Sequence, residues 1–150
     1  MSKCKYLLDT NIISILYKNY KSNNSIKKQE NLRENISKYN IDDLCSTTIS
    51  KYESLNWIKN WKDTENKSKN EIIRKTIKFY SIIELLDLDE ISIWRYKIII
   101  EEQNKKWFCQ KDHCDYFIAS ICLANDLILI TDNIKDFEKI DWLNIENWTK

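Results

Sequence analysis

The sequence predicts an α/β fold: a three-layer sandwich whose mainly parallel central sheet has about four or five short strands flanked by helices. Short apolar runs, typical of buried strands, alternate along the chain with longer stretches in which apolar residues recur at helical spacing. The chain has 150 residues, 43% of them hydrophobic, and no Pro-rich linker or repeat. We therefore expect a single domain that spans residues 1–150.

The first half of the chain alternates strand and helix patterns. Residues 5–8 form a short apolar run, and the apolar residues that follow suit a helix over 11–18. A second helix is expected over 26–39. Residues 44–48 resemble a short buried strand, and from Ile49 apolar and aromatic side chains recur at helical spacing. This half therefore predicts two strands that are each followed by a helix.

The second half continues the alternation, again without any proline to interrupt a helix. Its expected strands cover residues 85–88, 127–130 and 143–145. Its expected helices cover residues 66–83, 89–107, a segment that Asp112 caps, and 134–140.

The chain contains neither glycine nor proline. Glycine normally occupies the left-handed backbone conformation in turns, so Asn and Asp, the next most tolerant residues, must take these positions. The natural candidates are Asn19, Asn40, Asn125 and Asp126.

Charge and hydropathy exclude several classes of protein. The formal net charge is +1, so the chain has no basic coat of the kind that binds nucleic acid nonspecifically. No apolar run approaches the roughly 20 residues that a membrane-spanning helix needs. The apolar stretch near the N-terminus ends at Asp9, which does not fit a signal peptide. We therefore expect a cytoplasmic protein with no membrane partner.

Five cysteines, an odd number without a secretion signal, favour reduced thiols over a disulfide framework. Cys109, His113, Cys114 and Cys122 invite a zinc interpretation. Their spacing matches no standard zinc finger, so ordinary core cysteines are the favoured interpretation.

Acidic residues occur where predicted strands end. Asp9 closes the first strand, Glu53 follows the second strand, and Asp115 opens the helix that leads into the fourth. Because ligands gather at the carboxyl ends of parallel strands, these acids could converge on one edge of the sheet. The segment 131–133, Thr-Asp-Asn, leaves the fourth strand at the same edge.

Several carboxylates in one pocket repel one another and stay ionised together only if a cation lies among them. Oxygen ligands with no histidine among them suit Mg²⁺ or Mn²⁺, which also bind substrate phosphates. Such a site points to phosphodiester hydrolysis. Each acid alone could equally be a helix cap, a turn residue or part of a solvated helix face.

Five stretches carry a resemblance to the PIN domain family, and in particular to VapC-like toxin nucleases. They are LLDTNI at 7–12, STTISKYESL at 46–55, DYFIA at 115–119, LITDN at 129–133 with KDF at 135–137, and LNIENW at 143–148. The resemblance covers essentially the whole chain in order and implies a PIN-like sandwich. Relatives usually carry glycine where Asn125 and Asp126 stand here.

The resemblance also implies site residues. Asp9, Glu53 and Asp115 would be the principal ligands of Mg²⁺ or Mn²⁺, and Asn11 and Thr131 would be polar groups behind them. The fourth acidic position falls on Asn133, where many relatives have Asp. Either Asn133 contributes a neutral carbonyl or a water bridge, or Asp132 reaches in as a metal ligand. The neighbouring Asp136 is interpreted as helix surface.

The activity that the resemblance implies is a divalent-metal-dependent endoribonuclease, the toxin of a type II toxin–antitoxin pair. It would act on RNA, form a homodimer and be held inactive by a cognate antitoxin. Two alternatives stay open. The loss of an acid at Asn133 favours a catalytically weak binding or scaffold protein on the same fold, and a PIN nuclease of RNA processing without an antitoxin fits the same motifs.

RNA would have to reach an acidic pocket through local basic patches. Trp57 and Trp61, one helical turn apart, could stack on bases or contact a partner, although core or dimer packing is the simpler use. His113 could steady a phosphate or lie on the surface. Basic residues cluster, interleaved with acids as on a solvated helix face, at Lys18, Lys21, Lys27, Lys28 and Arg33, and at Lys59, Lys62, Lys67, Lys69, Arg74, Lys75 and Lys78.

Overall fold

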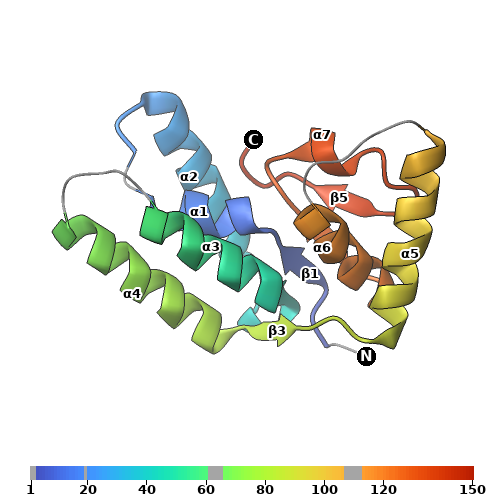
Figure 1. Ribbon diagram of the computed structural model, residues 1–150. Helices are drawn as coiled ribbons and strands as arrows, with labels where there is room; N and C mark the ends of the chain where they lie inside the picture. The colour runs from blue at the N-terminus through green and yellow to red at the C-terminus, as the bar shows by residue number, and fades with distance from the viewer. Residues whose placement is uncertain (1–2, 19, 61–65, 107–112) are drawn as a thin grey trace.

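A computed structural model describes residues 3–18, 20–60, 66–106 and 113–150, with the side chains of 66–68 excepted (Figure 1). Within this part of the chain the central sheet has five strands in the order β3-β2-β1-β4-β5, and every neighbouring pair is parallel. The strands are β1 (Tyr6–Leu8), β2 (Leu44–Thr47), β3 (Glu84–Leu86), β4 (Ile128–Ile130) and β5 (Asn144–Glu146). The predicted fold class is confirmed.

Helices cover both faces of this sheet, with α1 to α4 on one side of β1 and α5 and α6 on the other (Figure 1). In the described residues they are α1 (Thr10–Tyr17), α2 (Asn23–Ile36), the short 3₁₀ turn η1 (Ile41–Asp43), α3 (Thr48–Asn60), α4 (Asn66–Ile82), α5 (Glu90–Lys105), α6 (His113–Ala124) and α7 (Ile134–Phe137).

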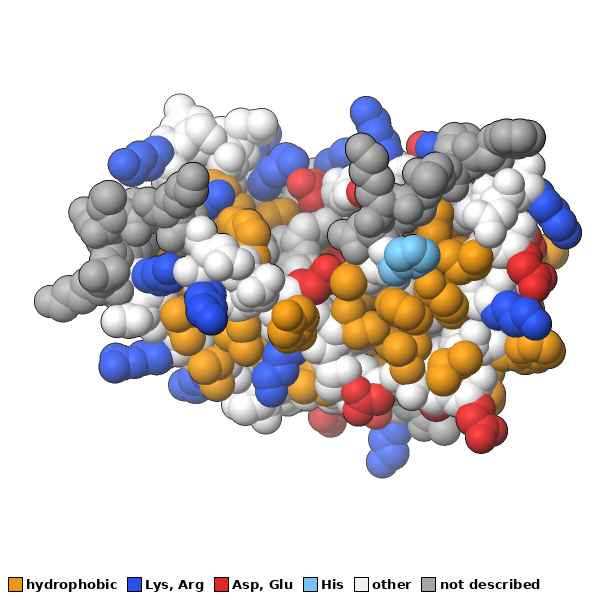
Figure 2. Space-filling view, in the orientation of Figure 1, with side chains coloured by type: hydrophobic (Ala, Val, Ile, Leu, Met, Phe, Trp, Pro, Cys, Tyr) orange, Lys and Arg blue, Asp and Glu red, His pale blue; other side chains and the backbone are white. Residues whose placement is uncertain are grey.

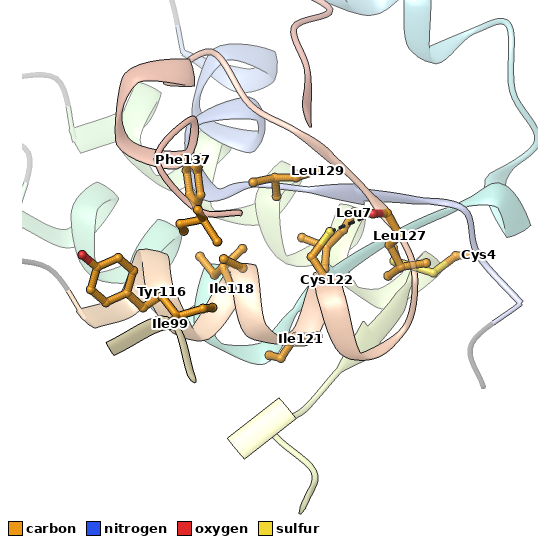
Figure 3. Close-up of a cluster of buried hydrophobic side chains, with 13 residues drawn as sticks. Cys4, Leu7, Ile99, Tyr116, Ile118, Ile121, Cys122, Leu127, Leu129 and Phe137 are labelled. Carbon is orange, nitrogen blue, oxygen red and sulfur yellow. Dashed lines mark hydrogen bonds between the residues drawn. A yellow bond between two sulfur atoms is a disulfide. The ribbon is translucent and has the colours of Figure 1, made fainter. Parts of the chain in front are cut away.

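The three layers follow from the alternation of side chains along β1. Tyr6 and Leu8 pack into a core shared with α1, α2 and α4, whereas Leu7, between them, packs into a second core under α5 and α6. Figure 3 shows this second core, where Leu7 and Leu129 of the sheet face Ile118 of α6. Both faces of β1 are buried, which explains why its sequence is an uninterrupted apolar run rather than an alternating one.

Most predicted boundaries lie within a few residues of the observed ones, and the differences arise at helix ends. Helix α2 starts earlier than the predicted residue 26 because the Ser22 hydroxyl accepts a hydrogen bond from Ser25 N at 3.3 Å and caps the helix. Helix α7 ends at Phe137 rather than at residue 140. The expected cap Asp112 lies outside the described residues.

Two described residues other than glycine have positive φ angles, Asp126 at 53° and Trp142 at 70°. Asp126 was among the predicted positions, and its prediction is confirmed. Asn40 instead has φ −73°, and Asn125 continues the end of α6, where its N–H donates to the Ile121 carbonyl at 3.2 Å. These two predictions are wrong, and Asn19 lies outside the described residues.

The expectation that all cysteines are reduced is wrong, because Cys4 and Cys45 form a disulfide. The two residues are 41 positions apart in sequence. Cys4 lies just before β1 and Cys45 lies in β2, and because these strands pair side by side, the Cα atoms of the two cysteines are 5.9 Å apart. Cys122 keeps its thiol, which donates to the Leu127 carbonyl at 3.2 Å in the core under α6. Burial raises the pKa of this thiol, and the negative charge of Asp126 raises it further.

No helix in the described ranges is long and apolar enough to cross a membrane.

Candidate active site

Asp9 follows the last residue of β1 and caps α1. One carboxylate oxygen accepts from Thr10 N at 2.7 Å, and the other accepts from Asn11 Nδ2 at 3.1 Å and from Thr131 Oγ1 at 2.8 Å. The side chain is only 3% exposed. The carboxylate is therefore held in one orientation by groups from both ends of the chain.

Burial raises the pKa of Asp9 to about 6. The hydrogen bonds from Thr131 and Thr10 oppose this rise, and the negative charges of Glu53 and Asp136 add to it. Asp9 thus lies close enough to two other carboxylates to feel their charge. A cation bound among them would relieve this repulsion.

Glu53 comes from α3, the helix that follows β2. Its Oε2 accepts from Thr10 Oγ1 at 2.7 Å, so the residue directly after Asp9 orients the second acid. Asp115 lies in the first turn of α6, on the opposite side of the sheet from α3. Asp9, Glu53 and Asp115 all line one cavity of about 880 Å³. The structure therefore brings together the three acids that the sequence singled out.

Asn11 and Thr131 both donate hydrogen bonds to the Asp9 carboxylate, and Asn11 also lines the cavity. Asn11 Nδ2 donates to Thr131 Oγ1 at 3.0 Å as well as to Asp9, and Asn11 Oδ1 accepts from Asp132 N at 3.1 Å. Thr131 Oγ1 also accepts from Asn133 N at 3.0 Å. This network ties the ends of β1 and β4 together beneath the cavity.

Asp132 also lines the cavity, and three donors contact its carboxylate. Lys28 Nζ contacts one carboxylate oxygen at 2.8 Å, while Thr149 Oγ1 at 2.6 Å and Asn147 Nδ2 at 3.3 Å contact the other. Although partial burial acts to raise it, these hydrogen bonds hold the pKa of Asp132 below its usual value. Lys28, one of the expected RNA-binding lysines, is thereby committed to an ion pair within the chain.

Asp136 brings a fifth carboxylate to the cavity. The sequence interpretation left this residue on the surface of a helix; it is indeed exposed, but it also lines the cavity and accepts a hydrogen bond from Asn133 Nδ2. Asp136 lies three residues after Asn133, the N-cap of α7, so the two share one side of the helix entry. That spacing was the available signal for Asp136.

The donor set fits a hard divalent cation. Most of the polar side chains that line the cavity carry carboxylate, amide or hydroxyl oxygens. The Cys114 thiol also lines it, whereas His113 does not. In the described part of the chain no three or more His, Cys, Asp or Glu side chains are grouped closely enough to hold a metal ion by themselves. An open arrangement agrees with Mg²⁺, which takes one or two carboxylates and completes its shell with water and phosphate oxygens.

His113 lies outside this cavity. It is exposed, as its pale-blue side chain in Figure 2 shows, and its Nδ1 is 2.7 Å from Tyr96 Oη on α5. The surface interpretation of His113 therefore agrees with its position. Within the described residues, His113, Cys114 and Cys122 belong to no group that could hold a metal ion, and Cys109 lies outside those residues.

Comparison with known proteins places this geometry in a family. The model of the PIN domain matches residues 6–143. Ribonuclease VapC2 of Rickettsia felis is 30% identical over 145 residues, which cover 97% of this chain and 98% of that protein.

Two solved structures have the same architecture over almost their full length. The DNA-bound VapBC of Salmonella typhimurium superposes with a TM-score of 0.78 at 25% identity, covering 97% of this chain and 98% of that one. VapBC2 of Rickettsia felis, bound to a DNA fragment from its promoter, superposes with a TM-score of 0.72 at 26% identity, covering 95% and 98%. The chain belongs to the PIN domain family.

Proposed function

We propose that this chain is a divalent-metal-dependent endoribonuclease, the toxin of a type II toxin–antitoxin pair. The observation that carries the proposal is the convergence of Asp9, Glu53 and Asp115, from three separate elements, on one cavity of a PIN domain. The ribonuclease named among the relatives covers this chain almost end to end, which supports RNA as the substrate.

In this proposal Asp9, Glu53 and Asp115 hold Mg²⁺ or Mn²⁺, and Asp136 adds negative charge at the rim. When bound, the ion would lower the pKa of the attacking water and stabilise charge on the leaving oxygen. The chain's own residues set the geometry. Thr10 orients Glu53, while Asn11 and Thr131 fix the carboxylate of Asp9.

We propose an antitoxin protein as the partner that controls this activity. The solved structures of VapBC from Salmonella and Rickettsia support this partner, because both are toxin–antitoxin complexes that resemble this chain over nearly its full length. We also expect a homodimer.

The gene next to this one would test the proposed antitoxin partner. A short reading frame that encodes a DNA-binding head favours the toxin, and an isolated gene favours an RNA-processing nuclease.

The alternative of an inactive scaffold rests on Asn133 standing at an acidic position. Asp136 weakens this alternative, because it brings a carboxylate to the same cavity and hydrogen-bonds to Asn133. A scaffold would bind RNA without cutting it, so cleavage assays separate the two functions.

The test is cleavage of total RNA by the purified chain with Mg²⁺ or Mn²⁺ and with EDTA. We expect metal-dependent cleavage that Asp9→Asn and Asp115→Asn each reduce on the order of a hundred-fold or more, because each removes charge that stabilises the transition state. Asp141→Asn is the matched control, since this exposed acid pairs with Lys106 and does not line the cavity. Cleavage that persists in EDTA, or that both active-site variants retain, would contradict the proposal.

A further inference from the structure

The cavity extends past the carboxylates to an end with a different character. Its lining there changes from acids to aromatic, amide and basic side chains that the proposed reaction does not use. These residues are Lys18 at the end of α1, Tyr20, and Asn56, Trp57 and Asn60 of α3.

Helix α3 connects the two ends of the cavity. Glu53, Asn56, Trp57 and Asn60 recur at helical spacing and lie on the face that lines it. Trp57 is one turn beyond Glu53, a rise of about 5.4 Å along the helix axis. A nucleotide whose phosphate lies at the carboxylates would therefore bring its base, or that of its neighbour, to Trp57.

Lys18 and two aromatic rings form a cluster at this end. The ammonium of Lys18 lies 5.1 Å from the ring centroid of Trp57 and 5.7 Å from that of Tyr20. The indole is 38% exposed. Lysine side chains are flexible, so a base can displace the Lys18 stem from the indole face while the ammonium moves toward a phosphate.

Amides complete the cluster. Asn60 Nδ2 donates to Asn56 Oδ1 at 3.3 Å, one turn apart on α3. Amide side chains carry both donors and acceptors, the complement of the edges of an unpaired base. Stacking platforms with amides and a cation beside them are the means by which proteins bind single-stranded nucleic acid.

We propose that this end of the cavity is a subsite for one unpaired RNA base next to the cleaved phosphate. The base stacks on Trp57, Lys18 contacts the adjoining phosphate, and Asn56 and Asn60 contact the base edge. A base inside a duplex cannot reach this surface, so binding in the subsite requires the base to be unpaired. This inference rests on the proposed function and adds the part of the substrate that the site selects.

The chain offers a matched control on α5. The Lys97 ammonium lies 5.1 Å from the Trp94 ring, the same separation as in the Lys18–Trp57 pair, and neither Lys97 nor Trp94 lines the cavity. Trp94 is 63% exposed, so its replacement should not disturb the core. Trp57→Leu therefore removes an indole ring that lines the cavity, and Trp94→Leu removes one that does not.

The experiment measures binding separately from cleavage. A fluorescein-labelled unstructured ten-nucleotide RNA is titrated by anisotropy with the full chain carrying Asp115→Asn, alone and with Trp57→Leu, Lys18→Gln or Trp94→Leu. Base stacking on an aromatic ring predicts a loss of about ten-fold in affinity for Trp57→Leu. We expect a smaller loss for Lys18→Gln, an unchanged affinity for Trp94→Leu, and weak binding of the same RNA in a duplex.

A single abasic ribose moved along the RNA gives the second measurement. We expect one or two positions at which the abasic RNA binds the parent about ten-fold more weakly, and we expect this difference to vanish in Trp57→Leu. Equal effects of Trp57→Leu and Trp94→Leu, or parent binding that no abasic position weakens, would overturn the subsite and leave this surface to a peptide partner. The proposed function fails separately, if the wild-type chain cuts no RNA with Mg²⁺ or Mn²⁺.

Discussion

At the scale of single residues, Asp9 combines burial with neighbouring charges of the same sign, and each of these disfavours an ionised carboxylate. It is almost fully buried, and its neighbours Glu53 and Asp136 carry the same charge. Three hydrogen bonds, from Thr10, Asn11 and Thr131, hold its carboxylate without supplying a positive charge. In the metal-free protein the ionised form of Asp9 therefore opposes folding.

Because ionised Asp9 opposes folding, the stability of the metal-free protein should depend on pH. The pKa of Asp9 is about 6 in the folded chain against an ordinary 3.8, so the folded state holds a proton that the unfolded state releases between these values. The free energy of unfolding should consequently fall as pH rises from about 4 to about 6, by up to about 3 kcal/mol. Thermal melts in EDTA would measure this fall.

The control is Asp9→Asn, which lacks the titrating group. We expect the melting temperature of the wild type to drop relative to that of Asp9→Asn as pH rises, and excess Mg²⁺ at neutral pH to restore the wild type more than the variant. Parallel melting curves for the two proteins at every pH would contradict this role for Asp9.

Trp142 is a second residue under local constraint. It has a φ angle of 70° and its side chain is 88% exposed, so it bears the cost of the left-handed conformation without burying its ring. Trp142→Gly should raise the free energy of unfolding by about 0.5–1 kcal/mol relative to Trp142→Ala, which truncates the ring but keeps a Cβ. Chemical denaturation measures the difference, and a Gly variant no more stable than the Ala variant would refute the explanation.

At the scale of elements, the segment after β4 is fastened by Asp132. Its carboxylate joins Lys28 of α2 to Asn147 and Thr149 near the C-terminus, and its N–H donates to Asn11 Oδ1. The side chain is 23% exposed, so part of this energy is screened by solvent. Asp132 thus joins two distant segments to the loop that carries Thr131 and Asn133.

Asp132→Ala should lower the free energy of unfolding by about 2 kcal/mol, because it leaves three donors without their acceptor. Asp141→Ala, which breaks an exposed pair with Lys106, should cost less than about 1 kcal/mol. Calorimetric titration with Mn²⁺ then distinguishes a structural role of Asp132 from a role as a metal ligand. We expect folded Asp132→Ala to bind Mn²⁺ with an affinity within a few-fold of that of the wild type. A complete loss of Mn²⁺ binding with unchanged stability would make Asp132 a ligand instead.

The elements themselves were largely predictable from local patterns. Buried parallel strands such as Tyr6–Leu8 are continuous apolar runs, and helices such as Asn66–Ile82 show clear apolar spacing. Features that depend on partners distant in sequence were not predictable in this way. The Cys4–Cys45 disulfide required knowing that β1 and β2 are neighbours, and the role of Asp132 required knowing where the C-terminus folds back.

At the scale of the whole molecule, the parallel sheet explains why the candidate site could be predicted in part. Asp9 and Glu53 follow adjacent parallel strands, so topology alone brings them to one edge, and Asp115 reaches that edge at the start of α6. The carboxylate of Asp136 was interpreted as helix surface because it lies on a four-residue helix, and a short polar segment suggests exposure to solvent. The aromatic end of the cavity likewise exists only once α1 and α3 pack together.

The central claim is that these side chains hold one divalent cation, and anomalous diffraction from crystals grown with Mn²⁺ tests it most directly. We predict a single strong peak in the cavity, within about 2.0–2.4 Å of carboxylate oxygens of Asp9 and at least one of Glu53 and Asp115, and no peak there in crystals of Asp9→Asn. Strong Mn²⁺ peaks confined to other surfaces, or a cavity peak that Asp9→Asn keeps, would contradict it.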